Sequence, residues 1–170
     1  MIRERLRRPV RQIRADLRDR RARFAWAAMA LWSLLVAALH FGGLAYDVYT
    51  AVPWWDLLTH SMSGFGVAAL LWLSYCRPVR ARAAPLWLVP TVFLIGVGFE
   101  VYEYLFKSFW WEWSLRYYAV DTAVDLVLDA AGAAVVVAGH VAVRSLAPAW
   151  PESESSGQSE PTAPSDSVEG

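Results

Sequence analysis

Residues 54–64 read WWDLLTHSMSG and open an apolar segment that continues to Cys76. The segment is long enough to cross a bilayer, because a transmembrane helix needs about 20 apolar residues. It nevertheless carries Asp56 and His60, which are four residues apart and therefore share one face of a helix. Since ionisable groups are costly in lipid, the stretch predicts a membrane helix that turns a polar face toward other helices.

Apolar residues form four blocks of this kind, rather than being scattered along the 170-residue chain. The chain is 56% hydrophobic, and a soluble bundle would need a polar face that most of these blocks do not offer. The sequence therefore predicts an all-α fold, a four-helix transmembrane bundle within residues 24–147. The expected spans are 24–46, 54–76, 86–106 and 120–146.

The net charge of zero hides an asymmetry between the two ends of the chain. Residues 1–23 hold ten Arg against three acids, and apolar residues recur among them at helical spacing. We expect a basic amphipathic helix lying on anionic lipid, or a simple tail that sets the topology. Residues 148–170 hold five acids and no base, cannot bury a core, and are expected to form a disordered cytoplasmic tail.

Loop charges predict that both termini face the cytoplasm. The connection 77–85 holds three Arg, whereas the connection 47–53 holds no basic residue. Because basic loops stay on the cytoplasmic side, four spans place both ends inside. Aromatic residues cluster at the opposite boundary, where they are expected to form a belt: Trp54, Trp55, Trp110, Trp111, Trp113, Tyr117 and Tyr118.

Ionisable residues recur in the second, third and fourth spans at similar depths. At a rise of ~1.5 Å per residue, His60 lies ~9 Å, Glu100 ~10 Å and Asp125 ~7 Å below the outer boundary. A charge at a helix centre costs roughly 2.5–3.5 kcal/mol, so these groups must face the bundle interior. The set comprises Asp56, His60, Glu100, Glu103, Asp121, Asp125 and Asp129. Small residues at the same level are expected to let the helices approach closely: Gly64, Gly66, Gly96, Gly98 and Gly132.

Some of these groups also have purely structural interpretations. Asp56 and Asp121 are near enough to water to cap their helices. Glu103 can pair with Lys107, one helical turn away. Two histidines outside the acidic set, His40 and His140, are expected to be structural. His40 nevertheless lies at the same depth as the acidic set.

An oxygen-rich set with an imidazole suits a divalent cation, namely Mg²⁺, Mn²⁺, Ca²⁺ or Zn²⁺. Such a site would activate water or polarise a phosphoryl group of an envelope lipid. The candidate metal ligands are Asp56, His60, Asp121, Asp125 and Asp129, and the candidate catalytic groups are Glu100 and Glu103. A proton- or cation-binding element of a small oligomeric transporter and a non-catalytic membrane partner protein are the alternatives. The sequence leaves these open and does not settle whether the protein is an enzyme.

Several common activities are disfavoured by missing motifs. The chain has no GxGxxG, Walker, GxSxG, HExxH or CxxC sequence, which argues against the usual nucleotide, serine-hydrolase and zincin sites. Cys76 is the single cysteine, so an internal disulfide is excluded and a metal–thiolate cluster is disfavoured.

Three segments together resemble the YjdF-like family of small polytopic membrane proteins and, more distantly, VanZ-like proteins. They are WDLLTHSMSGF at 55–65, FEVYEYLF at 99–106 and VDTAVDLVLDAAGA at 120–133. The resemblance implies a multi-pass protein of a bacterial cytoplasmic membrane and implies no reaction. The chain departs from the third- and fourth-helix pattern of VanZ-like proteins, so glycopeptide resistance is not expected. The positions that the resemblance marks are Asp56, His60, Gly64, Glu100, Glu103, Asp121, Thr122, Asp125 and Gly132.

Overall fold

The computed structural model describes residues 10–11, 13–76, 84–107 and 111–146. Every regular element in these ranges is a helix, and the main ones are α2 (Arg20–Ala45), α3 (Val48–Ala51), α4 (Trp55–Tyr75), α5 (Leu88–Phe106) and α6 (Leu115–Leu146). All of these except the one-turn α3 are long and apolar enough to cross a membrane. The all-α fold with four candidate spans is therefore confirmed.

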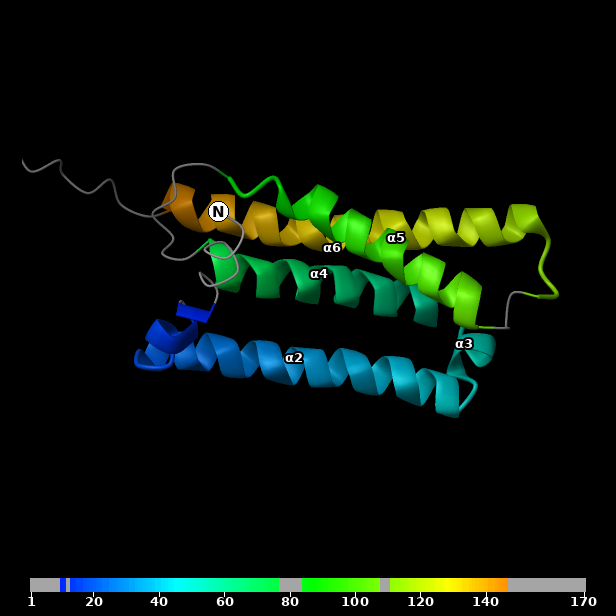
Figure 1. The fold of residues 1–170 in the computed structure, drawn as a ribbon, viewed down its shortest axis with the longest axis horizontal. Coiled ribbons are helices and arrows are strands. Elements are labelled where there is room, and N and C mark those ends of the chain that lie inside the picture. Colours follow the sequence, from blue (N-terminus) through cyan, green and yellow to red (C-terminus); the bar gives the residue numbers. More distant parts are fainter. Residues whose placement is uncertain (1–9, 12, 77–83, 108–110, 147–170) are drawn as a thin grey trace, which may run out of the picture.

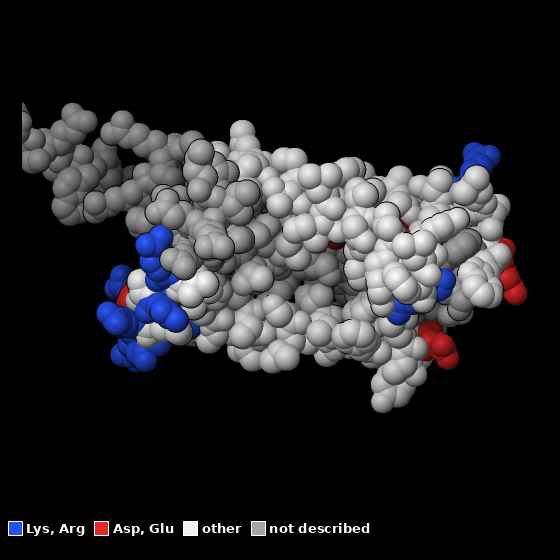
Figure 2. All heavy atoms as spheres, in the orientation of Figure 1, with Lys and Arg blue, Asp and Glu red and all other residues white. Residues whose placement is uncertain are grey.

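The four long helices run up and down the bundle in chain order (Figure 1). The central element is α4, which packs most extensively against α6 and also contacts α2 and α5. Among these elements the Cα atoms of α2 come within 8 Å of those of α3 and α4 alone, although the ring of His40 on α2 contacts that of Phe99 on α5. The helix therefore lies beside the bundle formed by the other three long helices. Figure 2 shows that Lys and Arg on the visible face lie at the two ends of the bundle, with an almost uncharged band between them. This distribution fits a protein that crosses a bilayer.

Two glycines allow the close contact between α4 and α6. A Cβ on Gly64 would collide with the backbone of Asp129, 2.5 Å from its Cα. A Cβ on Gly132 would lie 2.5 Å from the backbone oxygen of Ser61 and the backbone nitrogen of Phe65. The expected close approach at these glycines is confirmed. The expectation of a close approach is wrong for Gly98, where a Cβ would meet nothing within 4 Å.

Short polar caps set two helix ends that hydrophobicity alone does not locate. The Asp19 carboxylate accepts a hydrogen bond from the Arg21 N–H at 3.1 Å, and α2 begins at Arg20. The Ser114 hydroxyl accepts one from the Tyr117 N–H at 3.2 Å, and α6 begins five residues before the predicted span. Such caps satisfy N–H groups that have no partner within the helix.

The basic N-terminal segment is only partly described. Residues 10–11 and 13–16 are helical, and a turn at residues 17–19 separates them from α2. The predicted helix over 1–23 is therefore interrupted in its described part. Its lipid-binding role stays a prediction, and residues 1–9 and 12, like the predicted tail at 148–170, lie outside the described residues.

Candidate functional site

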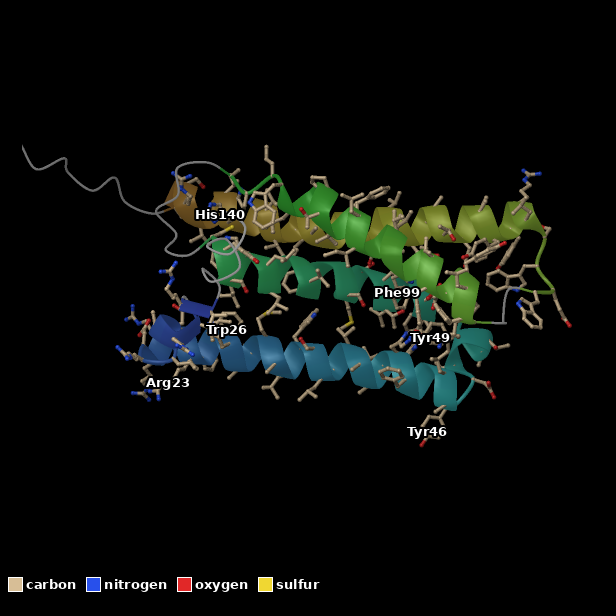
Figure 3. All side chains as sticks on the ribbon, in the orientation of Figure 1. Arg23, Trp26, Tyr46, Tyr49, Phe99 and His140 are labelled. Atoms are coloured by element: carbon tan, nitrogen blue, oxygen red, sulfur yellow. The ribbon has the colours of Figure 1, made fainter. Side chains whose placement is uncertain are left out.

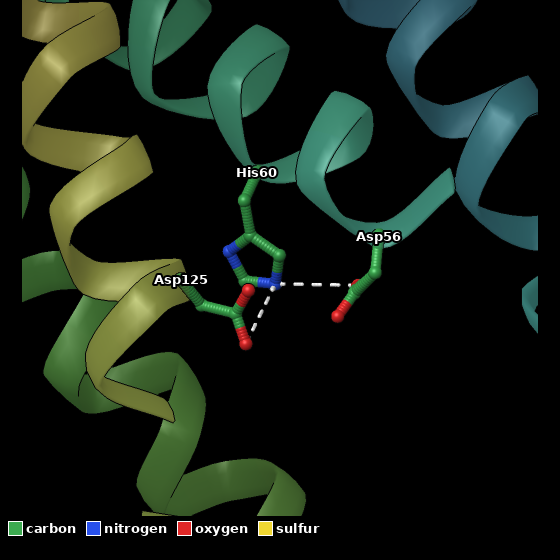
Figure 4. Close-up of side chains that lie close together, drawn as sticks. All are labelled: Asp56, His60 and Asp125. Carbon is green, nitrogen blue, oxygen red and sulfur yellow. Dashed lines mark ion pairs between the residues drawn. The ribbon is translucent and has the colours of Figure 1, made fainter. Parts of the chain in front are cut away.

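The imidazole of His60 lies between two carboxylates near one end of the α4–α6 pair (Figure 4). Its Nε2 atom is 3.7 Å from Oδ1 of Asp56, one turn earlier on α4. The same nitrogen is 3.9 Å from Oδ2 of Asp125 on α6. Each of the three residues offers one ligand atom, and these atoms all lie within 4.8 Å of one another. The predicted convergence of α4 and α6 at this level is thus present in the geometry.

A third carboxylate faces the other side of the same ring. Oδ1 of Asp129 is 3.6 Å from Nδ1 of His60, so the two ring nitrogens face different acids. On the α5 side, a Cβ on Gly96 would lie 2.6 Å from Oδ2 of Asp129, which shows how closely α5 passes. We call Asp56, His60, Asp125 and Asp129 the acid–histidine cluster.

The cluster is assembled by helix periodicity and by the close helix contact described above. Asp125 and Asp129 are four residues apart on α6, and His60 is four residues before Gly64 on α4, so each set shares a face. Gly64 lies directly against the backbone of Asp129, which brings His60 level with both acids. His60, Asp125 and Asp129 are 9%, 4% and 7% exposed, so these groups are withdrawn from the surface.

Glu100 on α5 is buried beside the cluster but is not one of its three mutually close donors. Its Oε2 atom accepts a hydrogen bond of 2.9 Å from the hydroxyl of Thr122, one turn before Asp125 on α6. Its Oε1 atom is buried and has no hydrogen-bond partner within the described part of the chain. A buried carboxylate with one unused oxygen can accept a proton or a further donor.

Glu103 and Asp121 are half-buried and lie outside the three-donor set. Asp121 is the seventh residue of α6, so its interpretation as a helix cap is wrong. Asp56 lies in the first turn of α4, where a negative charge is favourable, but Trp54 is the N-cap residue. Lys107 places its Nζ 5.9 Å from the ring centroid of Tyr102, and the described residues show no ion pair between it and Glu103.

Tyr49 and Thr59 lie beside the cluster, and the sequence analysis did not identify either of them. The His40 Nδ1 atom lies 2.8 Å from the Tyr49 hydroxyl, which in turn donates to Thr59 at 3.4 Å. Burial raises the pKa of the Tyr49 phenol, so this hydroxyl stays protonated and can donate. Tyr49 and Phe99 lie at the same end of the bundle in Figure 3. Thr59 could have been found from the sequence because it directly precedes His60. Tyr49 could not, because it lies in the one-turn α3, which is too short to show a helical periodicity.

His140 lies at the opposite end of the bundle from Tyr49 (Figure 3). Its Nδ1 atom accepts a 3.1 Å hydrogen bond from the indole N–H of Trp72. This contact ties α6 to α4 and agrees with the expected structural role. His40 is likewise hydrogen-bonded as expected for a packing histidine, although it lines a cavity together with His60.

Comparison with known proteins identifies a family but no reaction. The model of a family described as "Predicted membrane protein (DUF2238)" matches residues 15–145. The match covers all four spans and is consistent with the resemblance to YjdF-like proteins, while it gives no support to the VanZ-like one. No curated protein and no solved structure gives a significant match.

Proposed function

Since the chain belongs to the family of predicted membrane proteins (DUF2238), we propose that its acid–histidine cluster is a divalent-cation site acting on a membrane lipid or lipid-linked substrate. The observation that carries this proposal is the mutual approach of three ligand atoms from two helices. These atoms belong to Asp56, His60 and Asp125 and lie within 4.8 Å of one another.

The spacing of the three donors suits a cation after a small inward movement of the side chains. Two ligands of one ion lie at most twice the metal–ligand distance apart, about 4.2 Å for Mg²⁺ or Zn²⁺ and about 5 Å for Ca²⁺. The His60 nitrogen is 3.7 Å from the Asp56 oxygen and 3.9 Å from the Asp125 oxygen, within both limits, and all three donors lie within 4.8 Å of one another, within the Ca²⁺ limit. Three protein ligands leave a coordination position for water or substrate, as in catalytic metal sites.

The position of Asp129 beside Nδ1 of His60 supports the assignment of Nε2 as the metal ligand. Metal-binding histidines usually donate the N–H of their second ring nitrogen to a carboxylate or carbonyl, which fixes the ring and its tautomer. Asp129 lies 3.6 Å from Nδ1 of His60, while Nε2 faces Asp56 and Asp125. We therefore assign Asp129 to orienting His60, and we assign ligation to the other three residues.

A bound cation would polarise a carbonyl or phosphoryl oxygen, or lower the pKa of a bound water molecule. Glu100 is the proposed general base, because its Oε1 atom has no partner in the described structure while Thr122 holds its Oε2 atom. Glu103 and Asp121 are half-buried and would add negative charge around the site.

We place the site near the outer surface of a bacterial cytoplasmic membrane. The described arginines at the start of α2 and at the end of α6 lie at the bundle end opposite the cluster (Figures 1 and 2). Basic residues mark the cytoplasmic side, so this end is proposed to be cytoplasmic and the cluster to be on the outer side.

The proposal is tested by metal titration of protein purified in detergent and stripped with a chelator. Wild-type protein should bind about one equivalent of Mn²⁺ or Zn²⁺, detected by calorimetry and by elemental analysis after desalting. Asp125→Asn and His60→Gln should each weaken binding at least tenfold, because each removes a donor from a three-ligand site. His140→Gln is the matched control and should bind normally. A stripped wild-type protein that takes up neither ion, or equal losses in all three variants, would refute the metal site.

A further inference from the structure

We propose that the cavity between α2, α4 and α5 receives one hydrocarbon chain of a membrane lipid and that the polar end of this lipid lies beside His60, which among the three assigned ligands is the one that lines the cavity. The proposal rests on the function proposed above and specifies its substrate as an amphiphile that enters sideways from the bilayer. It is carried by the shape, the opening and the polarity of the cavity.

The cavity has a volume of about 360 Å³ and follows the helices lengthwise. Along α2 its lining extends from Trp32 to Phe41, and along α4 from Thr59 to Leu70. These ranges correspond to a length of about 15 Å at 1.5 Å per residue, so the cavity is an elongated slot along the helices. One chain of methylene groups at contact distances of about 3.5–4.0 Å suits such an elongated slot.

The cavity opens toward lipid because no Cα atom of α2 lies within 8 Å of one in α5. The rings of His40 on α2 and Phe99 on α5 are in contact beside the polar end of the cavity, with centroids 6.1 Å apart, and other residues of both helices line the cavity. Figure 2 shows the corresponding hollow in the middle of the visible face. At this level the surrounding solvent is the hydrocarbon of the bilayer, so the molecule at the opening is a lipid chain.

The polarity of the lining gives the bound lipid a direction. Most of the walls are apolar, with Val36, Val67 and Val92 among them. The ionisable groups of the lining lie where the cavity reaches the cluster, at His40, His60 and Asp129, and the lining also holds the hydroxyl groups of Ser33, Thr59 and Ser63. A mostly apolar pocket with a few converging polar groups is typical of ligand sites. The chain would lie along the valines and its ester or phosphoryl group would face His60.

Tryptophan substitutions on opposite walls of the cavity test this proposal. Ala37→Trp on α2 and Ile95→Trp on α5 place a large side chain in the slot, because both residues line it. Their neighbours Ala38 and Leu94 are exposed and do not line it, so Ala38→Trp and Leu94→Trp are matched controls. Each protein is mixed with phosphatidylethanolamine–phosphatidylglycerol (3:1) vesicles, extracted and washed in dodecyl maltoside. Retained lipid is then counted by native mass spectrometry.

Wild-type protein and both controls should retain one lipid per chain, and both slot variants should retain at least fivefold less. Size-exclusion profiles identify any variant that fails to fold. If one of the two slot variants fails to fold, the lipid retention of the other one tests the proposal. Equal retention in slot variants and controls, or no lipid on the washed wild-type protein, overturns the proposal. Mn²⁺ titration separates it from the metal site: Ala37→Trp should still bind the ion, and Asp125→Asn should still retain lipid.

Discussion

Replacing Gly64 with alanine should force α4 and α6 apart and thereby open the acid–histidine cluster. The added Cβ would lie 2.5 Å from Cα of Asp129 and still closer to its backbone oxygen. Backbone atoms cannot turn away as a flexible side chain can, so the helices themselves must move.

The size of the effect follows from these distances. Restoring a normal carbon–carbon contact of about 3.5 Å requires a helix displacement of about 1 Å. Overpacking of this kind typically costs about 1–3 kcal/mol, and alanine gains about 0.8–1.0 kcal/mol over glycine in a helix, so we expect a net loss of up to about 2 kcal/mol. The same displacement would lengthen the His60–Asp125 separation from 3.9 Å to about 5 Å, beyond the limit of about 4.2 Å for ligands of Mg²⁺ or Zn²⁺.

The assay compares Gly64→Ala with Gly98→Ala, because a Cβ at Gly98 would meet nothing within 4 Å. Thermal unfolding in one detergent should show a clear loss of stability for Gly64→Ala and unchanged or higher stability for Gly98→Ala. Metal titration should show at least a tenfold weaker affinity for Gly64→Ala alone. If both variants were equally stable and bound metal equally well, the claimed contact between α4 and α6 would be wrong.

Three further predictions concern single contacts. Thr122→Val should cost about 1–3 kcal/mol of stability, because Oε2 of Glu100 loses its donor, and Thr122→Ser should restore most of it; identical melting of both variants would contradict this. Trp72→Phe should lower the melting temperature by a similar free energy, because Nδ1 of His140 loses its buried partner, and an unchanged melting curve would count against that contact. Burial raises the pKa of the Cys76 thiol, so iodoacetamide should alkylate it several-fold more slowly at pH 8 than a cysteine peptide, with the rate rising toward higher pH; an equal rate would show an ordinary thiol.

The membrane fold was predictable because long apolar blocks require no tertiary information. Each of the four spans is found within a few residues of its expected position, and the errors lie at the ends. The start of α6 shows why: hydrophobicity begins at Val120, but the helix begins at Leu115 because Ser114 caps it. A single polar residue in a loop determined that boundary, and the hydrophobic pattern does not register it.

The cluster was predictable in depth but not in detail. Helix rise placed His60 level with the acids of α5 and α6, and helix periodicity gave each set a common face. Which acid meets which ring nitrogen depends on helix rotation, and this separated Asp129 from Asp56 and Asp125. Sequence spacing carries no information about rotation between different helices.

The position of α2 relative to the other helices could not be predicted from the hydrophobic pattern either. Its apolar surface is the same whether it faces lipid or another helix, so the separation of its backbone from that of α5 could not be foreseen. Tyr49, which links His40 to Thr59, comes from the one-turn α3, which is too short to leave a periodic signal.

The most direct test of the central claim is pulsed electron paramagnetic resonance of Mn²⁺ added to the stripped protein. If His60 is a ligand beside Asp56 and Asp125, the spin-echo modulation should show one directly bound imidazole nitrogen. That signal should disappear in His60→Gln and persist in His40→Gln. Mn²⁺ bound without any nitrogen coupling, or a coupling that survives loss of His60, would contradict the assignment of this cluster as a metal site.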